Sequence, residues 1–182
     1  MADATDGDTP SHVVVREAST EDVPGIRRVA REGWHAAYGD FLAAETVERA
    51  LYQWYAPAVV ERTVTDPDVA YLVAEPADLA AEDVDHTVLG YVSGHAASGR
   101  YGSVSSFYVD PDRWGEGIGN ALFGRELAVL ASNGVERVEL EVLAENEVGR
   151  GFYESRGFDA VGESADDLFG TVHPVVVYAR DV

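Results

Sequence analysis

Apolar residues recur along the chain at spacings that separate helices from strands. The run at 19–38 places apolar and small residues on one helical face, and Ser19 or Thr20 can cap its first turn. The run "VERVELEVL" at 135–143 alternates instead, with its apolar residues on one face and its glutamates on the other. The first pattern predicts a helix and the second a strand.

The other runs divide in the same way. A second helical region at 43–64 is broken at Pro57, and a later helix ends at Asn133-Gly134. The remaining predicted elements are strands at 12–18, 69–75, 87–97, 101–109, 158–163 and 173–180, and a short helix at 145–157. This order predicts an α/β fold with a mixed sheet, helices on both faces, and an acidic hairpin loop at 76–86.

A chain of 182 residues suits one domain with a substantial core. We expect that domain to span 12–182, after a flexible acidic tail at 1–11. The tail lacks the basic and apolar regions of a signal peptide, and no apolar run approaches the roughly 20 residues that span a bilayer. A cytoplasmic protein with no membrane partner is therefore expected.

The charge is strongly acidic, because 33 Asp and Glu residues face 13 basic residues, a net charge of −20. Such a surface repels nucleic acid, so no nucleic-acid partner is expected. All the basic residues are Arg and none is Lys. A polycationic partner would not explain that bias, whereas high salt, with a Debye length of about 3 Å at 1 M, would screen the acidic surface. We therefore expect a halophilic protein.

Missing residue types exclude several chemistries. The chain has no Cys, which excludes disulfides, thiolate metal sites and an acyl-thioenzyme intermediate. The absence of Lys excludes a Walker A phosphate loop and a Schiff base. The five His residues show no metal-binding spacing, so no metal is expected.

Three glycines at alternate positions interrupt the chain where an apolar helix begins, in "RWGEGIG" at 113–119. A helix N-terminus presents unpaired N–H groups and partial positive charge, and glycines there let a pyrophosphate approach the backbone. The spacing differs from the GxGxxG of dinucleotide folds, and several predicted strands precede it. A glycine loop without a ligand is the remaining alternative.

Two segments together resemble the GNAT acetyltransferase superfamily. "SSFYVDPDRWGEGIGNALF" at 105–123 resembles that family's acetyl-CoA motif. "LEVLAENEVGRGFYESRGF" at 140–158 is similar to its Asn…Tyr…Gly-Phe pattern, in Asn146, Tyr153, Gly157 and Phe158. The resemblance extends from about residue 12 and implies a mixed, mostly antiparallel sheet of about six or seven strands. It also implies an acetyl-CoA-dependent N-acetyltransferase.

The resemblance implies roles in binding acetyl-CoA. Backbone near Val109 would hold the pantetheine like an added strand and help polarise the thioester carbonyl, and the glycine segment would bind the pyrophosphate. Asn146 would contact the pantetheine or an ordered water, and Tyr153 would lie near the sulfur. The expected cofactor-binding residues are Phe107, Val109, Arg113, Trp114, Gly115, Gly117, Ile118, Gly119, Asn120, Asn146 and Tyr153.

Trp114 departs from the family motif, which usually has Gln or Arg at that position. An indole offers one hydrogen-bond donor and no charge. Either Arg113 reaches the pyrophosphate instead, or backbone amides suffice.

Acetyl transfer to an amine requires a base for the amine, a polarised carbonyl and an acid for the thiolate. Tyr153 is the candidate acid, since a phenol is protonated at neutral pH, unless it is only a packed aromatic. Glu141 is the candidate base, directly or through water, with Glu139 on the same face as a rival; the alternative is a solvated strand carboxylate. Many family members carry an acid on the fourth strand, where this chain has Ser105 and Ser106. Without Cys, direct transfer in a ternary complex is expected.

The resemblance places the acceptor site at the first helix, the loop after it and the last hairpin. Candidate residues are Trp34, His35, Tyr38 and Phe41, although two of these aromatics fit a core equally well. His173 in the last hairpin is a further possibility of the same kind. A small amine and a peptide N-terminus both remain open as acceptor, as do a monomer and a homodimer. A non-catalytic acyl-CoA-binding or sensory module on the same fold is the alternative function.

Overall fold

A computed structural model describes residues 9–78, 87–97 and 99–182. Most of the predicted N-terminal tail and most of the predicted loop at 76–86 lie outside these residues. Within the described part, no helix is long and apolar enough to cross a membrane.

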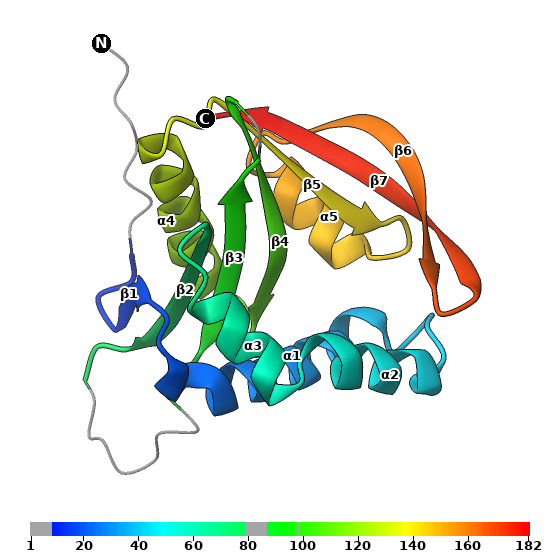
Figure 1. The fold of residues 1–182 in the computed structure, drawn as a ribbon, viewed down its shortest axis with the longest axis horizontal. Coiled ribbons are helices and arrows are strands. Elements are labelled where there is room, and N and C mark those ends of the chain that lie inside the picture. The colour runs from blue at the N-terminus through cyan, green and yellow to red at the C-terminus, as the bar shows by residue number, and fades with distance from the viewer. Residues whose placement is uncertain (1–8, 79–86, 98) are drawn as a thin grey trace.

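Seven strands form one sheet in the order β1-β2-β3-β4-β5-β7-β6 (Figure 1). All neighbouring strands are antiparallel except β4 and β5, which are parallel. The strands are β1 (Val13–Glu17), β2 (Val69–Pro76), β3 (Gly90–Ala96), β4 (Tyr101–Val109), β5 (Arg137–Leu143), β6 (Asp159–Leu168) and β7 (Thr171–Asp181). The predicted mixed, mostly antiparallel sheet is confirmed.

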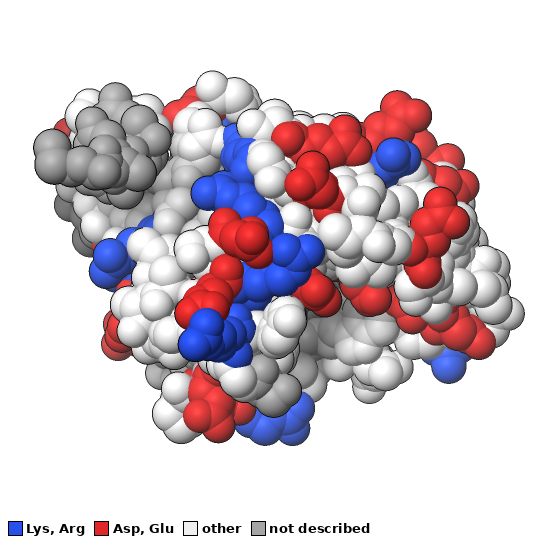
Figure 2. Space-filling view, turned by 90° about the horizontal axis from the view of Figure 1, so that it is seen from above, with Lys and Arg blue, Asp and Glu red and all other residues white. Residues whose placement is uncertain are grey.

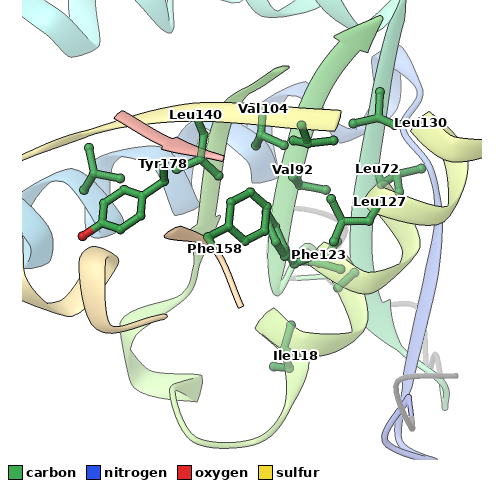
Figure 3. Close-up of a cluster of buried hydrophobic side chains, with 14 of the residues drawn as sticks. Leu72, Val92, Val104, Ile118, Phe123, Leu127, Leu130, Leu140, Phe158 and Tyr178 are labelled. Atoms are coloured by element: carbon green, nitrogen blue, oxygen red, sulfur yellow. The ribbon is translucent and has the colours of Figure 1, made fainter. Parts of the chain in front are cut away.

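Helices cover both faces of this sheet, as predicted, and each face has its own buried core. On one face, Tyr71, Val73 and Tyr91 pack against the first three helices. On the other, Val92, Phe123 and their neighbours form the cluster shown in Figure 3. The helices are α1 (Val23–Tyr38), α2 (Ala44–Trp54), α3 (Pro57–Val64), α4 (Ile118–Ser132) and α5 (Glu147–Glu154), with 3-10 turns η1 (Thr20–Asp22) and η3 (Pro111–Arg113).

Strand β6 extends beyond its predicted end at residue 163, to Leu168. Its second half, "SADDL", is polar and does not alternate, so the sequence carries no strand signal there. The pairing of β6 with β7 along the whole hairpin imposes the strand, and every residue before Leu168 remains exposed. The sequence therefore located the hairpin but underestimated its length.

The sheet splits between β4 and β5, which diverge in Figure 1. The two strands pair only where Tyr101–Ser103 meet Arg137–Glu139. On the other edge of β4, Ser93 pairs with Ser106 but Gly94 pairs with Val104, so Ser105 is an extra, bulged residue. A bulge bends its strand and increases its twist, which carries the rest of β4 away from β5.

Glu126 of α4 packs against this bulge and is fully buried. A Cβ at position 94 would collide with its carboxylate Oε1, which explains the glycine there. Both carboxylate oxygens lack a hydrogen-bond partner within the described residues. Burial raises the pKa of Glu126 from 4.5 to about 8, so the group is mostly protonated at neutral pH.

Acidic side chains are spread over much of the surface in Figure 2, with a band of arginines among them. Exposed ion pairs include Arg100 with Glu136 and Arg137 with Asp181, each at 2.7 Å between nitrogen and oxygen. Each such exposed pair stabilises the fold by only about 0–1 kcal/mol.

Replacing Glu126 by Gln should remove a pH-dependent loss of stability. Below pH 4.5 the carboxyl is protonated in both states; between 4.5 and about 8 only the unfolded chain ionises, so the native protein is progressively destabilised. We therefore expect the free energy of unfolding of Glu126→Gln, minus that of the wild type, to increase by on the order of 3 kcal/mol between pH 5 and pH 8. Denaturant unfolding at both pH values, with exposed Glu163→Gln as control, measures this; a difference independent of pH would contradict it.

Candidate active site

A cavity of about 470 Å³ fills the split between β4 and β5. We call it the strand cleft. It is lined by residues 104–109 of β4, residues 113–115 and 117–120 of the loop and helix start, residues 140–142 of β5, Gly33, Ala37 and Tyr38 of α1, and Asn146, Val148, Gly149, Phe152, Tyr153 and Arg156 in and beside α5. Because β4 and β5 do not pair here, the backbone of β4 faces the cleft instead of a neighbouring strand.

The glycine segment forms one end of the strand cleft. Gly115 and Gly117 have φ of +85° and +84°, which residues with side chains rarely adopt. Gly117 is the N-cap of α4, so the free N–H groups and partial positive charge of that helix lie at the cleft. A Cβ at position 119 would lie 3.3 Å from the rings of Phe107 and Phe152. Two glycines thus set the backbone path and the third allows close packing.

Trp114 fastens this loop to the end of β4. Its indole N–H donates to the carbonyl of Val109 at 3.0 Å. The neighbouring Arg113 lines the cleft, but its Nε donates to Glu116 at 3.0 Å. The side chain at the unusual motif position therefore acts as a tether, and Arg113 already has a carboxylate partner.

Asn146 caps α5, because its side-chain oxygen accepts the Gly149 N–H at 2.9 Å. A Cβ at position 149 would lie 2.7 Å from Asn146 Nδ2, so glycine there leaves room for the amide. Burial raises the pKa of the Tyr38 phenol, and the hydrogen bond with Tyr108 and a smaller effect of the Asn146 side chain oppose that rise.

Tyr153 projects from α5 into the strand cleft among aromatic rings, including Phe107 and Phe123. Burial raises the pKa of its phenol above the ordinary value, with a smaller contribution from Tyr38. The group is therefore protonated at neutral pH and can donate a proton inside the cleft.

Arg156 is a cleft residue that sequence reasoning missed. Its guanidinium carbon lies 3.4 Å from the centre of the Phe152 ring, and Nη1 donates to the Phe152 carbonyl at 2.6 Å. Within the described residues it makes no ion pair with a carboxylate. Its position in "YESRGF", three residues after Tyr153, was the available signal, because that spacing puts both on one side of a helix.

A second cavity, of about 340 Å³, lies between the sheet and α1–α3. We call it the aromatic pocket. Its walls carry Trp34, Tyr38, Trp54, Tyr55, Tyr71 and Tyr108, and the other lining residues are Val60, Thr63, Ser93, Ser105, Ser106, Glu141, Leu143, Asp166, Leu168 and Val175. Five residues line both cavities: Tyr38, Ser105, Ser106, Tyr108 and Glu141. The two cavities therefore meet where Glu141 stands.

The four predicted acceptor residues fall into two groups: two line a cavity and two do not. Trp34 and Tyr38 line the aromatic pocket, and Trp34 is also buried in the core. His35 is exposed, with Nε2 3.1 Å from Glu48, and lies outside the lining of both cavities. Phe41 also lies outside and packs edge-on against Tyr38.

Two further candidates, Glu139 and His173, are accounted for by local contacts. Glu139 lies 3.8 Å from Arg137 and lines neither cavity, whereas Glu141 lines both. His173 Nδ1 lies 3.7 Å from Glu145. Among the described residues, no group of three or more His, Asp or Glu side chains could hold a metal ion.

Comparison with known proteins gives consistent matches. A model of the acetyltransferase (GNAT) family matches residues 31–158. Mycothiol acetyltransferase of Beutenbergia cavernae is 36% identical over 100 residues, which are 55% of this chain and only 31% of that protein. Spermidine N(1)-acetyltransferase of Thermoplasma acidophilum is 23% identical over 160 residues, 86% of this chain and 94% of that protein.

The fold is shared with solved structures. The PaiA N-acetyltransferase of Thermoplasma acidophilum, crystallised in complex with coenzyme A, superposes with a TM-score of 0.74. The superposition covers 93% of this chain and 99% of that chain, at 21% sequence identity.

Substitution of Gly117 by Ala should destabilise the protein by about 1–2 kcal/mol, because a side chain at this φ is strained. Gly124 on α4 is the matched control, since a Cβ there meets nothing within 4 Å and alanine favours a helix by about 1 kcal/mol. Thermal and denaturant unfolding measure the change in the free energy of unfolding for each of the two variants. Equal effects of the two substitutions would show that the loop does not depend on its left-handed backbone.

Proposed function

This chain belongs to the acetyltransferase (GNAT) family, and on that premise we propose that it is an N-acetyltransferase that transfers acetyl from acetyl-CoA directly to a primary amine. The observation that carries the proposal is the junction of the strand cleft with the aromatic pocket at Glu141. A thioester in the first cavity and an amine in the second would meet there without a covalent enzyme intermediate, which agrees with the absence of Cys.

The strand cleft fits the chemistry of acetyl-CoA. The unpaired edge of β4 offers backbone N–H and C=O groups to the amides of an extended pantetheine. The start of α4 offers free N–H groups to the pyrophosphate. Arg156 adds a cation that no carboxylate within the described residues neutralises, and it is the candidate for a phosphate contact in place of Arg113.

Two side chains provide the proton transfers. Glu141 accepts a proton from the attacking amine, directly or through a water, as the C–N bond forms at the thioester carbonyl. The C–S bond breaks, and the departing thiolate takes the phenolic proton of Tyr153. The fourth-strand serines do not provide a base: Ser106 shares a hydrogen bond of 2.7 Å with Ser93.

Tyr153→Phe and Glu141→Gln should each lower kcat by about 10²–10⁴, the usual contribution of a general acid or base. The Kd for acetyl-CoA should change little, because neither substitution alters the backbone groups or the helix start that would bind it. Amine-dependent release of CoA thiol measures kcat, and calorimetry measures Kd.

Glu139→Gln is the matched control, since it removes a carboxylate from the same face of β5 outside both cavities. Unchanged kcat in Tyr153→Phe would remove the tyrosine as acid. Acetyl-CoA binding without turnover of any amine, peptide N-termini included, would favour a non-catalytic acyl-CoA-binding module instead.

Arg156→Gln should raise the KM for acetyl-CoA about tenfold, which corresponds to a lost charged hydrogen bond of roughly 1.5 kcal/mol. The KM for an acetylated pantetheine that lacks phosphates should not change. Arg125→Gln, which removes an arginine from the exposed side of α4, is the control. Equal loss with both thioesters would show that Arg156 supports the fold of the cleft and not phosphate binding.

A further inference from the structure

The lining of the aromatic pocket is acidic. The described residues of its lining include two carboxylates, Glu141 and Asp166, and no Arg or His. Among the described residues, neither carboxylate takes part in an ion pair or a side-chain hydrogen bond. Two unneutralised carboxylates in one pocket favour a cationic occupant and disfavour one that carries a carboxylate of its own.

The two carboxylates lie on the same face of the sheet but at different ends of the pocket. Glu141 pairs with Val177 of β7, and Asp166 pairs with His173 of the same strand. Residues 173 and 177 are an even number apart, so both acids point to the side of the aromatic pocket. Sheet spacings put their Cα atoms roughly 16 Å apart, about 13 Å along β7 and about 10 Å across two strand intervals. One ammonium group cannot contact both.

The surface between the two acids suits a hydrocarbon chain. Leu143 and Val175, which pair with each other, lie between the two acids on the sheet side of the pocket, and Leu168 lies beyond Asp166. Trp34 and Trp54 line the pocket from helices α1 and α2, Tyr71 lines it from strand β2, and ring faces also attract ammonium groups. An occupant with two cationic ends and an apolar middle therefore matches the pocket along its length.

We propose that the acceptor is an aliphatic diamine or polyamine, whose second ammonium is bound by Asp166 while the reacting amine lies at Glu141. This inference rests on the proposed acetyl transfer and names the substrate class of the same site. Asp166 acts as a specificity residue: it stands at the far end of the pocket from the junction and takes no part in the bond-making step.

The test compares α,ω-diamines of increasing chain length with n-alkylamines of the same length, with acetyl-CoA as donor at a fixed salt concentration. Diamines long enough to reach Asp166 should have a kcat/KM at least about tenfold above that of the matched monoamine, the size expected for one charge-assisted contact. Asp166→Asn should bring this ratio close to one, because it should raise the KM for the diamine far more than the KM for the monoamine.

Glu163→Gln is the matched control for this substitution. Glu163 lies on the same strand, but it pairs with Val176 and so points to the opposite face of the sheet. Glu163→Gln removes one negative charge from the same hairpin but outside the pocket. The preference for diamines over monoamines should therefore remain unchanged in this variant.

Several results would overturn the inference. Equal kcat/KM of the wild-type enzyme for diamines and for monoamines, amino acids or peptide N-termini would overturn it, and no variant is needed for that test. An Asp166→Asn variant that loses activity equally toward both amine series would reduce Asp166 to a structural role. These outcomes leave the proposed acetyl transfer intact, whereas no turnover with any amine overturns that function and this inference together.

Discussion

The site depends on the loss of pairing between β4 and β5 after Ser103 and Glu139. Backbone N–H and C=O groups need partners when they are removed from water, and an unpaired strand edge offers a row of them. The bulge at Ser105 bends β4 away, and Glu126 occupies the space behind Gly94 on the α4 side. These local features of the sequence keep the two strands apart. The edge of β4 therefore faces a cavity that an extended ligand can enter.

The other parts of the site are positioned by the same split. The loop that leaves β4 returns as α4, so the helix start lies at the mouth of the opening, and Trp114 fastens it to Val109. On the other side, β5 carries Glu141 to the point where the strand cleft meets the aromatic pocket. Our functional proposal follows from this coincidence of a strand-like cleft, an anion-binding helix start and an acidic aromatic pocket at one junction.

The sequence was most informative where the local backbone alone decides the structure. The GxGxG spacing predicted a loop before α4, and the "ENEVGRGFYESRG" segment predicted a short helix at 145–157; the structure has both, with α5 at Glu147–Glu154. The role of Trp114 depends on the backbone carbonyl of Val109, which only the folded loop brings within reach of the indole. The same limit applies to Asp166, which lies in the polar half of β6, where pairing with β7 rather than residue pattern creates the strand. His35 and Phe41 line neither cavity, because a run of polar and aromatic residues does not fix which of them faces the sheet.

A structure of the protein bound to coenzyme A or a stable acetyl-CoA analogue tests the central claim most directly. We predict that the pantetheine lies along β4 residues 104–109 and hydrogen-bonds to their backbone, with the sulfur near Tyr153 and the acetyl position facing Glu141. A pantetheine bound outside the split between β4 and β5, or a thioester facing away from the aromatic pocket, would contradict it.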